Sequence, residues 1–269
     1  MLTERKRASI AGVPTAFLDA GRGEAVVALH GVPTSAALFE PLLPHLAGYR
    51  VIAPDLLGQG ETGTPTRGRL DYAAYEAHLE AFLGAVAPPH FHLIVHDFGG
   101  LLGLVWAAKH PGRIRSIVVL STTVTRSLRI TGLYAANLLF GKSFVRRVLP
   151  LTLKRGRPIV PLPADVWAAP WTRRRILRSR DLFSEPHLER LRSGLGRIDA
   201  PVMLIWGEDD DVFPLSSTRG LVDHLPQATL VTIPRCGHWP TIDAPEEVAE
   251  HVRVFLKANA GRWPVKTSP

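Results

Sequence analysis

The chain has 269 residues, of which 46% are hydrophobic and 21% charged, so its length and composition suit one large globular domain or two small ones. This composition excludes a disordered, collagen-like or coiled-coil protein, and the single cysteine excludes an internal disulfide framework and a multi-cysteine zinc site. The formal net charge of +8 is concentrated in residues 122–200, which contain sixteen Lys/Arg and five Asp/Glu.

Short apolar runs alternate with helical patterns over the first part of the chain, which predicts βαβ units and a mostly parallel sheet. Two short strands near Ser9–Ala11 and Thr15–Asp19 are expected to form an antiparallel edge. The predicted strands that follow are Ala25–His30, Arg50–Pro54, Phe91–His96 and Ile114–Leu120, and the predicted helices are Ala36–Leu46, Tyr72–Val86 and Phe98–His110.

The alternation stops after Leu120 and resumes near residue 201. Residues 122–198 show amphipathic helical patterns broken by Pro and Gly, and strands are again predicted over Pro201–Trp206 and Ala228–Ile233, with a final helix over Pro245–Asn259. We therefore expect one α/β domain made of residues 1–121 and 199–269, interrupted by a helical cap at residues 122–198.

The segment Leu93–Gly100 carries the most informative chemistry. A buried strand runs directly into a glycine-containing helix start, with Asp97 at the turn. This is the pattern of a nucleophile elbow, and a carboxylate there can displace a leaving group at carbon to form an enzyme ester. The alternative is an ordinary N-cap aspartate.

Three other loops follow predicted strands. In the loop His30-Gly31-Val32-Pro33, the backbone N–H of Val32, together with that of Phe98, would form an oxyanion hole. An acidic loop spans residues 207–214, and one of its carboxylates would orient a catalytic histidine. His238 lies in a Gly-Pro loop after the last strand and suits a general base. The alternatives are a plain turn, a solvated acidic loop and a structural histidine.

The motifs HGVPTS and HDFGG resemble those of the α/β-hydrolase fold family, in its haloalkane dehalogenase and epoxide hydrolase branch. The resemblance implies that Asp97 is the nucleophile and that His238 activates the water that hydrolyses the ester. It favours Asp210 as the acid, because the loop matches Gly-x-x-Asp-x-x-x-Pro, with Asp209 and Asp211 as fallbacks. It also implies a cis peptide bond between Val32 and Pro33.

The resemblance leaves the leaving-group contacts incomplete. Dehalogenases hold the halide with N–H donors, but the corresponding positions here are Phe98 and Val32, which have no side-chain donor. Trp167 and Trp171 in the cap are the remaining candidates. Epoxide hydrolases use two cap tyrosines, and this cap has Tyr134, with His187 as a conceivable partner. We predict a dehalogenase-like hydrolase, with an epoxide hydrolase or a non-catalytic ligand-binding protein of the same fold as alternatives.

The expected partners are a small to medium apolar substrate and water, with no cofactor and no metal. No Gly-x-Gly-x-x-Gly follows a strand, and no nucleic-acid-binding motif is recognisable. The basic cap is either a solvated surface or a weak membrane-surface contact. With no long apolar stretch and no apolar segment behind the basic N-terminus, a cytoplasmic location is the expectation. The sequence carries no signal for the oligomeric state.

Overall fold

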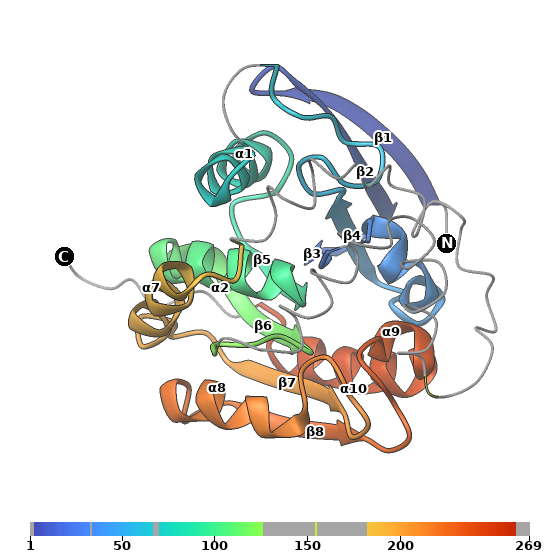
Figure 1. Cartoon of the computed structure of the whole chain (residues 1–269). Helices are drawn as coiled ribbons and strands as arrows, with labels where there is room; N and C mark the ends of the chain where they lie inside the picture. The colour runs from blue at the N-terminus through green and yellow to red at the C-terminus, as the bar shows by residue number, and fades with distance from the viewer. Residues whose placement is uncertain (1–2, 33, 67–69, 126–153, 155–181, 262–269) are drawn as a thin grey trace.

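The computed structural model describes residues 3–32, 34–66, 70–125, 154 and 182–261. These residues form an eight-stranded sheet with helices on both faces (Figure 1). The strands are β1 (Thr3–Ile10), β2 (Val13–Gly21), β3 (Glu24–Leu29), β4 (Tyr49–Pro54), β5 (Phe91–His96), β6 (Ile114–Leu120), β7 (Val202–Gly207) and β8 (Thr229–Ile233). The helices are η1 (Ala36–His45), α1 (Tyr72–Ala85), α2 (Phe98–Lys109), η2 (Pro111–Arg113), α7 (Glu185–Leu195), η4 (Leu215–Ser217), α8 (Thr218–His224), α9 (Pro240–Asp243) and α10 (Pro245–Ala258).

The strand order is β1-β2-β4-β3-β5-β6-β7-β8. Strands β3 to β8 pair in parallel, whereas β1 pairs antiparallel with β2 and β2 antiparallel with β4. The α/β-hydrolase fold predicted from the sequence is therefore confirmed. The chain moves to β4 on one side of β3 and to β5 on the other, so the crossovers diverge between β3 and β5. Open α/β sheets bind ligands at the carboxyl ends of the strands beside such a switch point.

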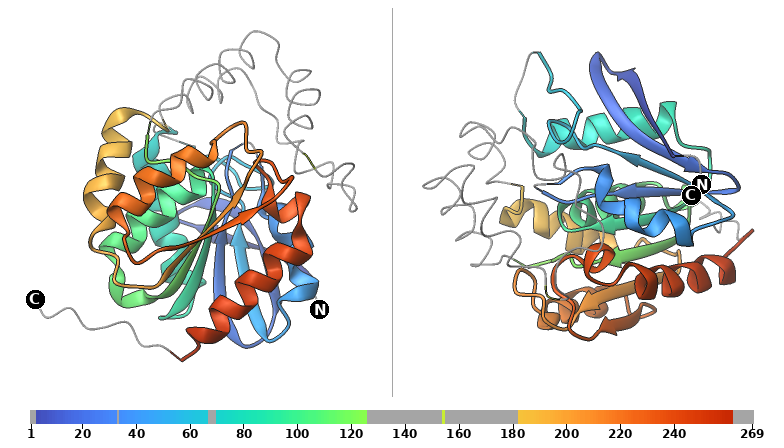
Figure 2. Two further views of the ribbon diagram at one scale, coloured as in Figure 1. Left: turned by 90° about the horizontal axis from the view of Figure 1, so that it is seen from below. Right: turned by 90° about the vertical axis from the view of Figure 1, so that its right-hand side faces the viewer.

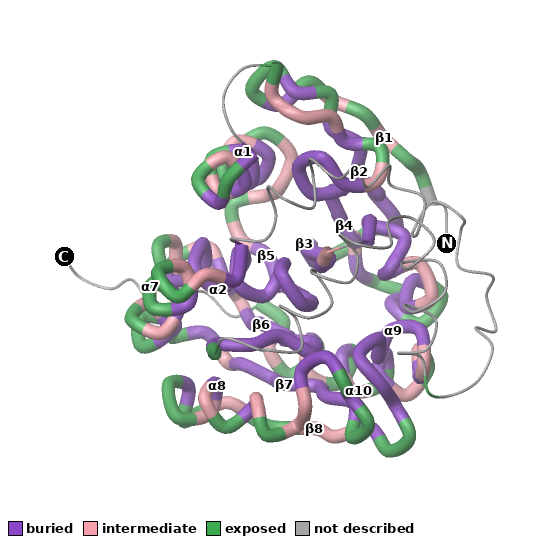
Figure 3. The backbone as a smooth tube through the Cα atoms, viewed as in Figure 1, coloured by how far each residue is buried: buried purple, intermediate pink, exposed green. Residues whose placement is uncertain are grey.

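Side chains of the parallel strands alternate between two buried clusters, one on each face of the sheet. On β3, Val27 and Leu29 pack with α1, α2, α7 and α8, whereas Val26 and Ala28 pack with η1, α9 and α10. Figure 2 shows η1 and α10 on one side of the sheet and α2, α7 and α8 on the other. Figure 3 shows the resulting buried centre, with exposed residues at the outer surfaces of the helices.

Two expected elements differ in detail from the sequence prediction. The N-terminal strands are longer than predicted and form one hairpin, in which Thr3 pairs with Ala20 and Ile10 with Val13. The predicted helix after β3 is a 3-10 helix containing Pro41 and Pro44. Proline has no N–H to donate back to an earlier carbonyl, so this segment cannot continue as a regular α-helix.

The described end of the predicted cap packs into the main core. Helix α7 buries Leu188, Leu191 and Leu195, and these side chains join the cluster that contains α2. Within the segment predicted as the cap, residues 126–153 and 155–181 lie outside the described residues.

Candidate active site

Asp97 occupies a sharp turn between β5 and α2. Its backbone has φ 50° and ψ −121°, an unusual conformation for a residue with a side chain. Two contacts from the next strand hold it: the N–H of Asp97 donates to the Ser121 carbonyl at 3.1 Å, and Thr122 Oγ1 donates to the Asp97 carbonyl at 2.7 Å. Such conformations cost ~1–3 kcal/mol and persist where surrounding contacts impose them, typically at functional sites.

Small residues after the turn allow α2 to approach the sheet. A Cβ on Gly99 would lie 2.3 Å from the Leu29 carbonyl oxygen, and one on Gly103 would lie 2.7 Å from Val95 Cγ1. The helix therefore begins directly above the carboxyl ends of β3 and β5. The side chain of Asp97 makes no capping hydrogen bond to α2, so its carboxylate is not used as an ordinary N-cap.

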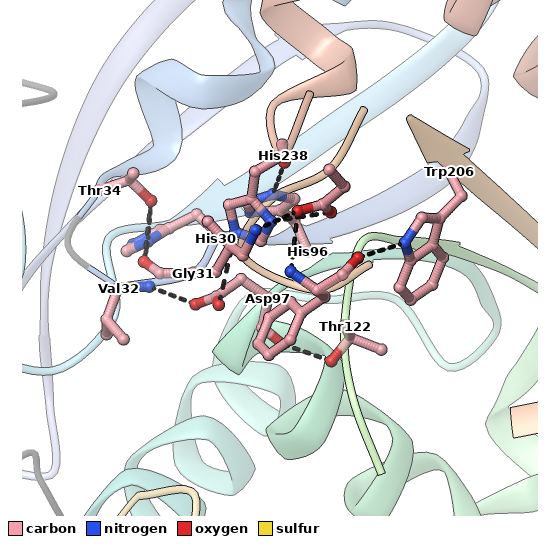
Figure 4. A network of polar contacts seen from close by, with 12 residues as sticks. His30, Gly31, Val32, Thr34, His96, Asp97, Thr122, Trp206 and His238 are labelled. Atoms are coloured by element: carbon pink, nitrogen blue, oxygen red, sulfur yellow. Dashed lines mark hydrogen bonds and ion pairs between the residues drawn. The ribbon is translucent and has the colours of Figure 1, made fainter. Parts of the chain in front are cut away.

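The Asp97 carboxylate points toward the loop after β3. The backbone N–H of Val32 donates to Asp97 Oδ1 at 2.8 Å (Figure 4). A Cβ on Gly31 would lie 2.4 Å from the same oxygen, so only glycine allows this approach. One carboxylate oxygen of Asp97 thus accepts the Val32 N–H, the group that the sequence analysis expects to be an oxyanion donor.

His30 holds that loop in place from inside the core. The N–H of Leu56 donates to His30 Nε2 at 2.8 Å, which leaves the ring proton on Nδ1, where it donates to the Gly31 carbonyl at 2.7 Å. Burial lowers the pKa of His30, which keeps the ring neutral in this arrangement. The strand and loop flanking Val32 are therefore fixed by a buried hydrogen-bonded side chain.

His238 lies between the two carboxylates. Its Nδ1 is 3.1 Å from Asp210 Oδ2, and its Nε2 is 3.7 Å from Asp97 Oδ2. The other oxygen of Asp210 accepts the N–H groups of Val212 and Phe213, each at 2.8 Å. Carboxylate, imidazole and carboxylate therefore form one buried series, as a nucleophile, base and orienting acid would.

Of the three adjacent aspartates in the acidic loop, the structure brings Asp210 to the histidine. Asp210 is buried, whereas Asp209 and Asp211 are exposed. Asp211 pairs with Lys154 at 2.5 Å instead. Asp209 and Asp211 are thus not placed to orient His238.

The charges of the series reinforce one another. Burial lowers the pKa of His238, but the Asp210 and Asp97 carboxylates outweigh it and raise this pKa to about 9. Burial raises the pKa of Asp210, but His238 and the N–H donors of Phe213 and Val212 together hold it below its ordinary value. The two carboxylates therefore favour the imidazolium form of His238.

Aromatic rings surround the residue after the nucleophile. The Phe98 ring is fully buried and meets Tyr72, Tyr75 and Phe183 edge-on, with centroid separations of 6.2, 5.1 and 5.8 Å. Phe98 is also the first residue of α2, so its N–H belongs to the helix's first turn, which lacks intrahelical acceptors. The second oxyanion donor expected from the sequence is thus the backbone N–H of Phe98. The Phe98 side chain contributes only apolar surface.

Three of the four leaving-group candidates in the predicted cap cannot be placed relative to Asp97, because they are not among the described residues. Tyr134, Trp167 and Trp171 lie outside the described residues, as does Pro33 of the expected cis bond. His187 lies on α7, where its ring stacks on Tyr72 at 4.3 Å and its Nδ1 is 3.0 Å from Ser184 Oγ. Tyr72 in turn meets the Phe98 ring edge-on, so the described contacts connect His187 to the aromatic rings beside the residue that follows Asp97.

Sequence reasoning missed three side chains that hold the site. They are His96, which contacts the His238 carbonyl at 2.9 Å; Thr122, which anchors Asp97; and Trp206, whose Nε1 donates to the Phe213 carbonyl at 2.8 Å (Figure 4). Trp206 carried a signal, because a buried tryptophan N–H requires an acceptor. The partners of His96 and Thr122 depend on how distant strands meet.

Neither a metal-binding cluster of His, Cys, Asp or Glu nor a helix long and apolar enough to cross a membrane occurs among the residues that the structure describes.

Comparison with known proteins agrees with this architecture. The profile of the family described as "Alpha/beta hydrolase family" matches residues 26–251. A cis-3-alkyl-4-alkyloxetan-2-one decarboxylase of Shewanella oneidensis is 27% identical over 267 residues, covering 89% of this chain and 84% of that protein. A haloalkane dehalogenase of Sphingobium indicum is 36% identical over 119 residues, 42% of this chain and 40% of that protein. The structure of a meta-cleavage product hydrolase from Pseudomonas fluorescens IP01 superposes with a TM-score of 0.77 at 25% identity, covering 94% of this chain and 97% of that one.

Proposed function

Because the chain belongs to the alpha/beta hydrolase family, we propose that it is a hydrolase that uses Asp97 as a carboxylate nucleophile, with a dehalogenase-like two-step reaction. The observation that supports this most directly is the position of the Asp97 carboxylate. Oδ1 is held by the Val32 N–H at 2.8 Å, while Oδ2 lies 3.7 Å from His238 Nε2. A carboxylate that only caps a helix would accept N–H groups of that helix, rather than have one oxygen on a distant loop N–H and the other beside an imidazole.

In the first step, Asp97 Oδ2 attacks an electrophilic carbon of the substrate, and the bond from that carbon to the leaving group breaks. The leaving group departs with the electron pair, and an ester forms on Asp97. Oδ1 becomes the ester carbonyl oxygen and remains at the Val32 N–H. The oxyanion position is therefore already occupied by the atom on which charge develops in the second step.

In the second step, His238 Nε2 takes a proton from water, and the water oxygen attacks the ester carbonyl carbon. The negative charge gathers on Oδ1, beside Val32. Collapse returns the Asp97 carboxylate and releases the alcohol, which receives the proton from His238. The water oxygen stays in Asp97.

Ester formation also prepares the base. The Asp97 carboxylate is one of the two groups that raise the pKa of His238. Once Asp97 is esterified, that negative charge is gone, and the pKa of His238 falls toward the neutral range. After the first step, the imidazolium releases its Nε2 proton to the leaving group or to solvent, and the neutral ring can then take a proton from water.

An oxetan-2-one is the second candidate substrate, favoured by the Shewanella relative and by the apolar surroundings of Phe98. A departing halide needs N–H donors, and Phe98 and Val32 supply none from their side chains. In ring opening at the alkyl carbon, the leaving group is a carboxylate that stays attached to the substrate. The carbon–carboxylate bond then breaks, its electron pair forms the alkene, Asp97 departs from carbon, and carbon dioxide is released without water.

A substrate panel tests these proposals. Halide release from bromoalkanes, diols from epoxides, and alkenes or β-hydroxy acids from cis-3,4-dialkyl oxetan-2-ones are measured separately. Asp97→Asn and Asp210→Asn should abolish the activity found, whereas Asp211→Asn, an exposed neighbour in the same loop, should leave it within about twofold.

Turnover that survives Asp97→Asn would refute the nucleophile assignment. Ligand binding without turnover in the unmodified protein would favour the non-catalytic alternative.

A further inference from the structure

His96 is the last residue of β5 and immediately precedes the nucleophile. Its side chain is fully buried, and Nε2 lies 2.9 Å from the backbone carbonyl oxygen of His238. A carbonyl oxygen only accepts hydrogen bonds, so the ring proton is on Nε2 and His96 is the donor. Its other nitrogen, Nδ1, is buried without a hydrogen-bond partner among the described residues.

The ring is also packed against the segment that it bonds. Its centroid lies 4.9 Å from that of His238 and 5.0 Å from that of Trp239. Burial lowers the pKa of His96 to about 4, and the neighbouring His238 acts in the same direction. His96 therefore stays neutral when His238 is an imidazolium, so two adjacent positive charges are avoided.

Three of the described hydrogen bonds that anchor the loop carrying His238 reach its main chain from elsewhere in the fold. The Asp209 N–H donates to the Cys236 carbonyl at 2.9 Å, and the Gly237 N–H donates to Asp243 Oδ2 at 2.7 Å. These two bonds join the base to the acid loop and to α9. Among the three, the bond from His96 is the one that comes from the strand bearing the nucleophile.

We propose that His96 is a positioning residue that fixes the main chain of His238 relative to Asp97. Residues 96 and 97 are consecutive, so a hydrogen bond from His96 ties the base loop to the nucleophile's own strand end. This bond adds a direct constraint on the separation between His238 Nε2 and Asp97 Oδ2 to those that the other anchors of the loop impose.

The proposal rests on the two-step reaction above for its kinetic consequence. Attack by Asp97 depends on Val32 and on Oδ2, neither of which His96 contacts in the structure. Water activation depends on where His238 points. Loss of the anchor should therefore slow ester hydrolysis more than ester formation, so that kcat and KM fall together and the ester accumulates.

The test compares His96→Gln with His96→Met. Both side chains are unbranched and similar in length, but only glutamine can place an N–H near the former Nε2. Wild type and His96→Gln should agree within about threefold in kcat. His96→Met should lose at least tenfold in kcat, show a burst of about one equivalent of leaving group, and carry the ester in intact-mass spectra.

Equal kcat and absence of a burst in His96→Met would overturn the proposal, as would equal losses in both variants. If His96→Met does not fold, His96→Asn replaces it, since its shorter amide cannot reach the His238 carbonyl, and the same burst is expected. Crystal structures of the variants separate this proposal from the proposed function: His238 Nε2 should move away from Asp97 Oδ2 in the methionine or asparagine variant but not in the glutamine variant, whatever the reaction. An unmoved His238 would overturn it.

Discussion

Gly31→Ala should disable the nucleophile by forcing it away from the Val32 N–H. The added Cβ would lie 2.4 Å from Asp97 Oδ1 and 2.4 Å from Asp97 Cβ, well below the 3.0 Å that real Cβ contacts respect. Side-chain rotation can move Asp97 Oδ1 but not Asp97 Cβ, so the main chain at residue 31 or 97 must also shift, and the 2.8 Å hydrogen bond from Val32 is lost. Gly31 does not have a positive φ, so the strain in the alanine variant comes from the clash with Asp97 and not from the φ angle.

The lost hydrogen bond sets the expected magnitude. Removing one oxyanion donor typically costs ~2.7–4 kcal/mol in the transition state, or roughly a hundred- to a thousandfold in kcat. The assay is kcat/KM on the best substrate of the panel, with the unfolding temperature as a check on the fold. Gly84→Ala, on α1, is the matched control, because its added Cβ would meet nothing within 4 Å. Activity of Gly31→Ala within threefold of wild type would refute the assigned role of Asp97 Oδ1.

Three further predictions follow from the site. Folding raises the pKa of His238 from 6.5 to about 9, so its contribution to the free energy of unfolding is complete below about pH 6.5 and disappears as the pH rises through about 9. Asp97→Asn should lower this pKa in an NMR titration of the imidazole. An unchanged pKa would contradict the coupling between Asp97 and His238. Tyr72→Phe removes a buried hydroxyl with no hydrogen-bond partner among the described residues, so urea denaturation should show a gain of about 1 kcal/mol rather than a loss. Phe98→Trp with Val32→Asn supplies two N–H donors and should raise halide release at least tenfold, about 1.4 kcal/mol, at a cost of ~1–3 kcal/mol in stability because Phe98 is tightly packed; a folded double variant without this gain would count against a dehalogenase.

The parallel strands and the loops after them could be predicted because short β-branched runs such as Phe91–His96 identify buried strands, and the carboxyl ends of parallel strands share one edge. The sequence predicts strand β1 too short, because its charged residues Glu4–Arg7 resemble a solvated basic terminus rather than an edge strand. Helix α7 has an amphipathic pattern that indicates a buried face, but the pattern does not say which surface covers it.

Contacts between distant strands were the least predictable part of the site. The bond from His96 to the His238 carbonyl joins residues 142 positions apart, and the bond from Thr122 to Asp97 joins two different strand ends. Histidine and threonine at these positions are equally compatible with a simple core environment. The sequence pattern indicates that these side chains are buried, whereas their hydrogen-bond partners depend on the order of the strands in the sheet.

The covalent ester on Asp97 is the most direct test of the central claim. A His238→Gln variant is mixed with the best substrate of the panel and analysed by intact-mass spectrometry and peptide mapping. Because ester hydrolysis needs the His238 base, the account predicts a mass increase of one substrate-derived group per chain, located at Asp97 and absent from the Asp97→Asn, His238→Gln double variant. Modification of a different residue would contradict the assignment of Asp97 as nucleophile. So would an unmodified variant, provided that the wild type turns over the same substrate at least a hundred times faster than the variant does.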